Sequence, residues 1–135
     1  MVATRESLNE SYPAAPASVP RARNTVVEFA AGSGASTVQL EAIKLSVSEA
    51  VSNAIVHAYD GGGGEVHVMA GLAAGELWVF VADDGCGFQA PARHPGLGWG
   101  LPLIAHMADG LEIAQRAEGG TEIRMRFGIG PGPAA

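Results

Sequence analysis

Three polar side chains recur at every fourth position in the middle of the chain: Glu49, Asn53 and His57. In a helix this spacing stacks them on one face, beside an apolar stripe formed by Ile43, Val47, Val51 and Ile55. The carboxylate of Glu49 could act as a general base or position a group near a phosphate, and the neutral oxygen of Asn53 suits Mg²⁺. His57 is more typical of a structural residue near a helix end. The row is therefore either a buried polar network or part of a site.

A second candidate follows an apolar run at residues 77–81, where the sequence reads Asp83-x-Gly85-x-Gly87. A carboxylate at the end of a strand can accept a hydrogen bond from an exocyclic amino group, and glycines allow a flat ring to approach the backbone. By itself the pattern favours an ordinary Asp-Gly turn.

A third candidate is the glycine run Gly96, Gly98 and Gly100, which leads into a helix expected from Leu101. Uncovered amides at a helix N-terminus can bind phosphate. The spacing differs from the dinucleotide-binding fingerprint, and the absence of a following lysine excludes a P-loop. Alone, this run is as consistent with a glycine-rich surface loop as with a phosphate site.

Hydrophobic periodicity predicts the elements that position these residues. We expect strands over residues 7–12, 65–70, 77–81, 111–115 and 121–127, and helices over 19–31, 37–59 and 101–108, with residues 71–75 as a hairpin connection. Ser18 is expected to cap the first helix, Ser36 or Thr37 to cap the second, and Pro102 to fall in the first turn of the third. The order predicts an α+β fold, a two-layer α/β sandwich whose mostly antiparallel mixed sheet carries helices on one face.

Length and composition predict one domain over residues 1–135, with a core at about 6–128 and a frayed tail at 129–135. A hydrophobic content of 47% excludes a disordered chain, and a formal net charge of −6 argues against a nucleic-acid partner. No apolar run is long enough to span a membrane, and no signal peptide is recognisable. The single cysteine, Cys86, favours a reducing compartment, so we expect a cytoplasmic protein.

Taken together, the motifs resemble those of the GHKL or Bergerat ATP-binding fold. Glu49-xxx-Asn53 matches its N-box, the segment 83–87 its first glycine box and the segment 96–101 its second, while Gly120-Thr121 matches a late Gly-Thr pair. Within that superfamily the chain is most similar to the anti-sigma factor serine/threonine kinases of bacteria. The stretches SEAVSNAIVHAY and PASVPRARNTVVEF carry this narrower resemblance.

The resemblance implies ATP and Mg²⁺ as cofactors. Asn53 would hold Mg²⁺, and Glu49 would be the catalytic residue that orients or deprotonates the attacking hydroxyl. Asp83 would accept a hydrogen bond from the adenine amino group, with Thr121 supporting it through water. The other nucleotide-binding positions implied by the glycine boxes are Gly85, Gly87, Gly96, Gly98, Trp99, Gly100 and Leu101.

The resemblance also implies partners: a sigma factor that the protein sequesters, an anti-anti-sigma protein of STAS type that it phosphorylates on serine, and a second copy in a homodimer. Arg93, between the glycine boxes, could reach the γ-phosphate.

A second hypothesis is a catalytically silent module of the same fold that binds ATP or a partner, and a third is an ATPase component of another assembly. Glu49 favours the kinase, because a pure binder needs no carboxylate beside the γ-phosphate.

Overall fold

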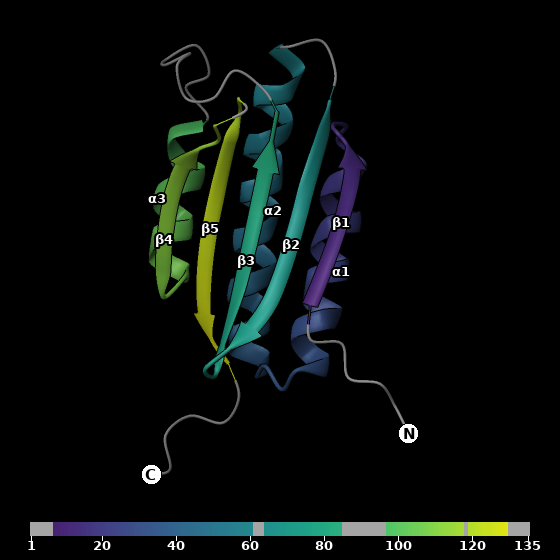
Figure 1. Cartoon of the computed structure of the whole chain (residues 1–135). Helices are drawn as coiled ribbons and strands as arrows, with labels where there is room; N and C mark the ends of the chain where they lie inside the picture. Colours follow the sequence, from purple (N-terminus) through teal and green to yellow (C-terminus); the bar gives the residue numbers. More distant parts are fainter. Residues whose placement is uncertain (1–6, 61–63, 85–96, 118, 130–135) are drawn as a thin grey trace.

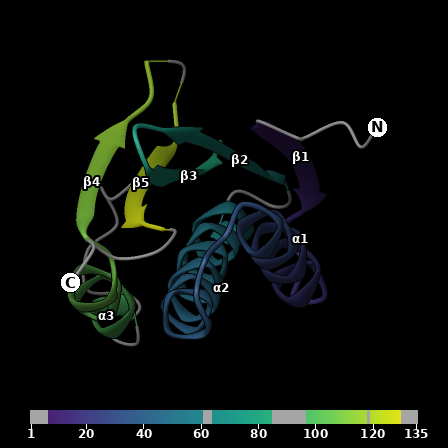
Figure 2. The same ribbon diagram turned by 90° about the horizontal axis from the view of Figure 1, so that it is seen from below.

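The computed structural model describes residues 7–60, 64–84, 97–117 and 119–129, with the backbone alone described for 57–60 and 97–100. These residues form a five-stranded sheet with helices on one face (Figures 1 and 2). The expected loose terminus at 1–6, the glycine run 61–63, Cys86 and the tail at 130–135 lie outside the described residues.

The sheet has the strand order β1-β2-β3-β5-β4, and every neighbouring pair is antiparallel. Its strands are β1 (Ser7–Pro13), β2 (Glu65–Ala73), β3 (Glu76–Asp83), β4 (Gly110–Gln115) and β5 (Thr121–Gly128). The predicted α+β two-layer sandwich is confirmed. Within the described residues its sheet is wholly antiparallel rather than mixed.

The β2–β3 hairpin is tighter than predicted. Ala74 and Gly75 alone form the turn, with φ angles of 52° and 79°. A two-residue turn with positive φ at both positions matches the twist of the flanking strands. Residues 71–73, predicted as part of the connection, therefore continue β2.

Three helices of the described chain cover the inner face of the sheet: α1 (Ser18–Gly32), α2 (Thr37–Asp60) and α3 (Leu97–Met107). Figure 2 shows α2 between α1 and α3, below the sheet. None of the helices in the described ranges is long and apolar enough to cross a membrane.

The start of α2 is fixed by Ser36. The Ser36 hydroxyl accepts from the Gln39 backbone N–H at 3.1 Å, and the Gln39 side chain accepts from the Ser36 N–H at 2.7 Å. This reciprocal pair is a capping box. The prediction for Ser18 was wrong, because Ala17 occupies the cap position of α1 and the Ser18 hydroxyl instead donates to the Pro13 carbonyl at 2.5 Å.

The third helix begins at Leu97 rather than at Leu101, so Gly98 and Gly100 are helical and Pro102 lies inside the helix instead of in its first turn. Ile104 is fully buried, and Leu101 packs against the same core. Burial of this apolar side offsets the poor helix propensity of glycine.

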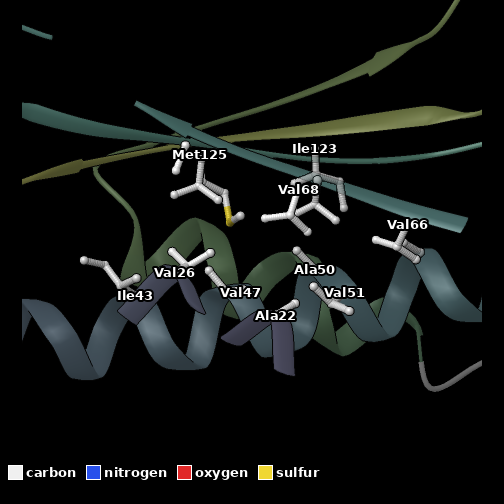
Figure 3. Packing of buried hydrophobic residues seen from close by; sticks show 14 of the residues in the cluster. Ala22, Val26, Ile43, Val47, Ala50, Val51, Val66, Val68, Ile123 and Met125 are labelled. Carbon is white, nitrogen blue, oxygen red and sulfur yellow. The ribbon is translucent and has the colours of Figure 1, made fainter. Parts of the chain in front are cut away.

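The core lies between the sheet and the helices (Figure 3). Alternate residues of β3 and β5 point into it, and the buried stripe of α2 faces them: Leu77, Val79, Val81, Ile123, Met125, Phe127, Ile43, Val47, Val51 and Ile55. The intervening strand residues lie on the open face, where the Arg126 guanidinium stacks over the half-buried Trp78 at 5.8 Å from the ring centroid.

Candidate functional site

Asn53, Asp83 and Thr121, three of the residues singled out in the sequence, lie toward one end of the sandwich. At this end β3 finishes at Asp83, β5 begins at Thr121 and α2 makes its last turns (Figure 1). The last β3–β5 pair is Ala82 with Glu122, so Asp83 follows directly beside the start of β5.

The packing of β5 on α2 shows which part of β5 lies beside Asn53. Figure 3 shows Met125 over Val47 and Ile123 over Ala50. Two residues of a strand and four of a helix both advance about 6 Å. One further step along both elements, from Ile123 to Thr121 and from Ala50 to Ala54, brings Thr121 to the turn of α2 that contains the buried Asn53.

Three polar side chains are buried at this end: Asn53 is 4% exposed, Asp83 3% and Thr121 2%. The Asn53 amide nitrogen and the Thr121 hydroxyl have no hydrogen-bond partner in the described part of the chain. A buried polar atom without a partner costs free energy, which a polar ligand can return by bonding to it. The donor set therefore fits a polar group such as a nucleotide.

Gly120 presses the start of β5 against the end of β3. Its φ of 91° lies in the left-handed region, and a Cβ at this position would overlap the carbonyl oxygen of Asp83 and come within 2.9 Å of the Asp84 Cα. Only glycine fits both the conformation and the close approach. The turn before Thr121 is thus held directly against Asp83 and Asp84, the described start of the first glycine box.

Glu49 precedes Asn53 by one turn of α2 and is half-buried. In the described part of the chain it forms no ion pair. His57 belongs to the last turns of the same helix, and only its backbone is described. The structure therefore places Glu49 and Asn53 on one helix face leading to the end of the sheet.

The described ranges contain no group of three or more His, Cys, Asp or Glu side chains able to hold a metal ion. A Mg²⁺ ion at Asn53 would therefore take most of its ligands from water and from phosphate oxygens, as Mg²⁺ commonly does.

The second glycine box lies at the start of α3. Gly98, Trp99 and Gly100 form its first turn, where backbone N–H groups have no partner within the helix and can bind an anion. The Leu101 side chain packs against the core. Gly85, Gly87, Gly96 and Arg93 lie outside the described residues.

Sequence reasoning missed a polar cluster on the open face behind Asp83. Asp84 accepts from Arg116 at 2.5 Å and lies 3.1 Å from the Nε2 atom of His67. The hydrogen bond with His67, together with the bond and charge of Arg116, holds the pKa of the Asp84 carboxyl below its ordinary value, against a smaller opposing effect of partial burial. His67 lies in β2, Asp84 directly follows β3 and Arg116 directly follows β4, so only the three-dimensional arrangement of the sheet could have revealed the cluster.

A shallow hollow also lies on the open face of the sheet. Residues of all five strands line it, among them Met69, Trp78, Phe80, Arg124 and Arg126. Neither Asn53 nor Asp83 nor Thr121 contributes to it, so it is separate from the buried polar group at the sheet end.

Comparison with known proteins agrees with this geometry. A family model described as a histidine kinase-like ATPase domain matches residues 12–127. The chain therefore belongs to the histidine kinase-like ATPase domain family.

Named relatives narrow the class. An anti-sigma F factor of Clostridium acetobutylicum is 31% identical over 132 residues, which cover 90% of this chain and 86% of the relative. A serine-protein kinase RsbW of Bacillus velezensis is 38% identical over 109 residues, covering 80% of this chain and 64% of the relative. The chain is thus similar to anti-sigma F factors and RsbW kinases.

A solved structure is similar over nearly the whole chain. It contains the RsbU and RsbW domains of Rv1364c from Mycobacterium tuberculosis, and it matches with a TM-score of 0.75 and 26% identity. The match covers 96% of this chain and 34% of the solved one, so this chain spans about a third of that protein.

Proposed function

We propose that this protein is an ATP-binding anti-sigma factor with serine/threonine protein kinase activity, which sequesters a sigma factor and phosphorylates a serine on an anti-anti-sigma partner of STAS type. The observation that carries the nucleotide site is the pair of buried, unpartnered polar atoms on Asn53 and Thr121 beside Asp83. The names of the relatives, anti-sigma F factor and serine-protein kinase RsbW, support the regulatory role.

At the adenine end, the buried Asp83 carboxylate accepts a hydrogen bond from the exocyclic amino group, and the Thr121 hydroxyl supports the base through water. Gly85 and Gly87, which lie outside the described residues, belong to the proposed adenine site through the resemblance of the first glycine box alone. The low dielectric constant of the surrounding core strengthens each of these bonds. Recognition of the base therefore rests on β3 and β5.

At the phosphate end, the carboxamide oxygen of Asn53 would hold Mg²⁺. The amides of the second glycine box, Gly96, Gly98, Trp99, Gly100 and Leu101, would bind phosphate oxygens. ATP would supply the γ-phosphoryl group, and Mg²⁺ would neutralise negative charge on the phosphates. Both cofactors would thus lie between α2 and α3, which pack side by side (Figure 2).

Glu49 is the proposed catalytic residue. Its carboxylate lies one helical turn before Asn53 and is half-buried. There it would orient the serine hydroxyl of the partner and take the hydroxyl proton as the serine oxygen bonds to the γ-phosphorus of ATP. The bond from that phosphorus to the β–γ bridging oxygen breaks in the same step, and ADP leaves. A homodimer is part of the proposal, as the resemblance to anti-sigma kinases implies.

The experiment is affinity purification of the tagged protein from its native host, followed by incubation of the complex with Mg²⁺ and γ-labelled ATP. We expect a sigma factor and a small STAS-type protein to co-purify, and label to appear on a serine of the latter. A sigma factor without any labelled protein would instead favour the catalytically silent module. Recovery of neither partner would contradict the anti-sigma role.

A further inference from the structure

We infer that Arg116 is a positioning residue that holds Asp83 in the orientation needed to recognise adenine, and that His67 and Asp84 complete the support. The inference rests on the proposed nucleotide site. It assigns to the open face of the sheet a role in base specificity on the opposite, buried face.

Arg116 bonds to two consecutive residues at the end of β3. Its Nη1 atom donates to the backbone carbonyl of Asp83 at 3.2 Å and to the Asp84 carboxylate at 2.5 Å. The last residue of β3 that pairs with β5 is Ala82. The arginine therefore holds the Asp83 carbonyl where the ladder on that side has ended.

The same carbonyl is confined by Gly120, whose missing side chain leaves the space that the carbonyl occupies. Gly120 and Arg116 belong to one turn, because the Arg116 N–H donates to the Gly120 carbonyl at 3.0 Å. The turn between β4 and β5 thus contacts the Asp83 carbonyl in two ways: the Gly120 backbone packs against it, and the Arg116 guanidinium donates to it.

His67 secures Asp84 from the other side. Its Nε2 atom lies 3.1 Å from the second carboxylate oxygen of Asp84, and its Nδ1 atom lies 2.9 Å from the Ser11 hydroxyl. The chain of contacts from Ser11 through His67 and Asp84 to Arg116 joins β1, β2, the end of β3 and the β4–β5 turn. Both oxygens of the Asp84 carboxylate are therefore held.

Asp84 directly follows β3, so holding it also restrains Asp83, the last residue of the strand, and the side chains of the two neighbours differ sharply in exposure. The Asp84 side chain is 58% exposed, whereas Asp83 is 3% exposed. An ion pair this exposed adds little to stability, so its loss should alter the aim of the Asp83 carboxylate more than the folding of the chain.

The test compares ATP with inosine triphosphate, which carries an oxygen in place of the exocyclic amino group of adenine. Calorimetric affinities of both are measured for the wild type, Arg116→Ala, Arg116→Lys and Asp83→Asn, with thermal melts to check folding. We expect Arg116→Ala to weaken ATP about tenfold, the effect of a misaligned charge-assisted bond, and to leave inosine triphosphate unchanged. Arg116→Lys keeps the charge but lacks the planar guanidinium, so its ATP affinity should lie between those of the wild type and Arg116→Ala.

Arg124→Ala is the matched control. Arg124 is also an open-face arginine, and it pairs with Glu112 at 2.6 Å and Glu122 at 3.2 Å without contacting Asp83. Its replacement should leave the preference for ATP unchanged. If Arg116→Ala fails to fold, the lysine variant is compared with Arg124→Lys in the same way.

The outcomes separate the two proposals. A wild-type preference for ATP that Asp83→Asn abolishes but both Arg116 variants retain would overturn the positioning role and leave the adenine site intact. Equal weakening of both nucleotides by the Arg116 variants would also overturn it, since that indicates a purely structural role. No preference in the wild type would overturn the adenine site itself, and the inference with it.

Discussion

Gly120 lies against Asp83 so closely that a Cβ on the glycine would overlap the aspartate carbonyl oxygen. Asp83 and Thr121 are the two residues proposed to recognise the base. The contact joins Asp83, at the end of β3, to the turn that leads into Thr121, at the start of β5. The end of β3 and the start of β5 are therefore held in close contact.

Gly120→Ala should be strongly destabilising. Alanine would suffer both the positive φ of 91° and the overlap with Asp83, so we expect a loss of about 3 kcal/mol or more in the free energy of unfolding. Gly119→Ala is the control, because its φ of 103° is similar but a Cβ there meets nothing within 4 Å. It should lose only about 1–2 kcal/mol. Equal losses in urea titrations would contradict the close packing.

Thr121→Val should separate ligand binding from stability. The buried hydroxyl has no described partner, so its removal should leave the unliganded protein as stable or more stable, by up to about 1 kcal/mol. ATP affinity should nevertheless fall about fivefold, since the hydroxyl supports the base. Ser46→Ala also removes a buried, unpartnered hydroxyl, but one further back on α2. It should leave ATP affinity unchanged, and a fall equal to that of Thr121→Val would refute the assignment.

Sequence patterns predicted most of the fold because the core follows simple periods. Val47 and Val51 of α2, and Ile123 and Met125 of β5, are buried as their spacing predicts. The sequence predicts that α3 starts at Leu101, because glycines are typical of loops. This start is wrong, since the helix begins at Leu97 and burial of Ile104 stabilises a helix that includes Gly98 and Gly100.

The site was predictable only in part. Motif spacing identified Asn53, Asp83 and Thr121, and the structure brings these buried residues to one end of the sheet. Arg116 and His67 have no motif. Their contact with Asp84 depends on the register of β2 and β3 and on a turn elsewhere in the chain, and single-sequence periodicity contains neither.

Glu49→Gln should greatly slow phosphotransfer without weakening ATP binding. The amide cannot take the hydroxyl proton, so the rate of transfer to the partner should fall by about 10²–10⁴, while ATP affinity stays unchanged because the effect falls on the transition state. Glu41→Gln, at an exposed position two turns earlier on α2, is the control and should transfer at the wild-type rate. A Glu49→Gln enzyme with wild-type activity would show that Glu49 is not catalytic.

Acid should erase the contribution of Asp84. Because the pKa of its carboxyl is lowered in the folded protein, mainly by the bond with His67, its stabilising effect is complete above the ordinary value of 3.8. The effect is lost as the pH falls through the lower, folded value. Asp84→Asn should therefore melt slightly below the wild type at neutral pH, and the two melting temperatures should converge in strong acid. A difference that grows on acidification would contradict the cluster.

We propose that Asn53 of α2, together with Asp83 and Thr121 at the end of the sheet, forms a Mg²⁺-dependent ATP site. Isothermal titration of the purified protein with ATP, in the presence of Mg²⁺ and again with EDTA, tests it most directly. We expect heat of binding with Mg²⁺ and little without it, and we expect the remaining ATP affinity of Asn53→Ala no longer to depend on the metal. Absence of binding by the folded wild type at millimolar ATP with Mg²⁺ would contradict it.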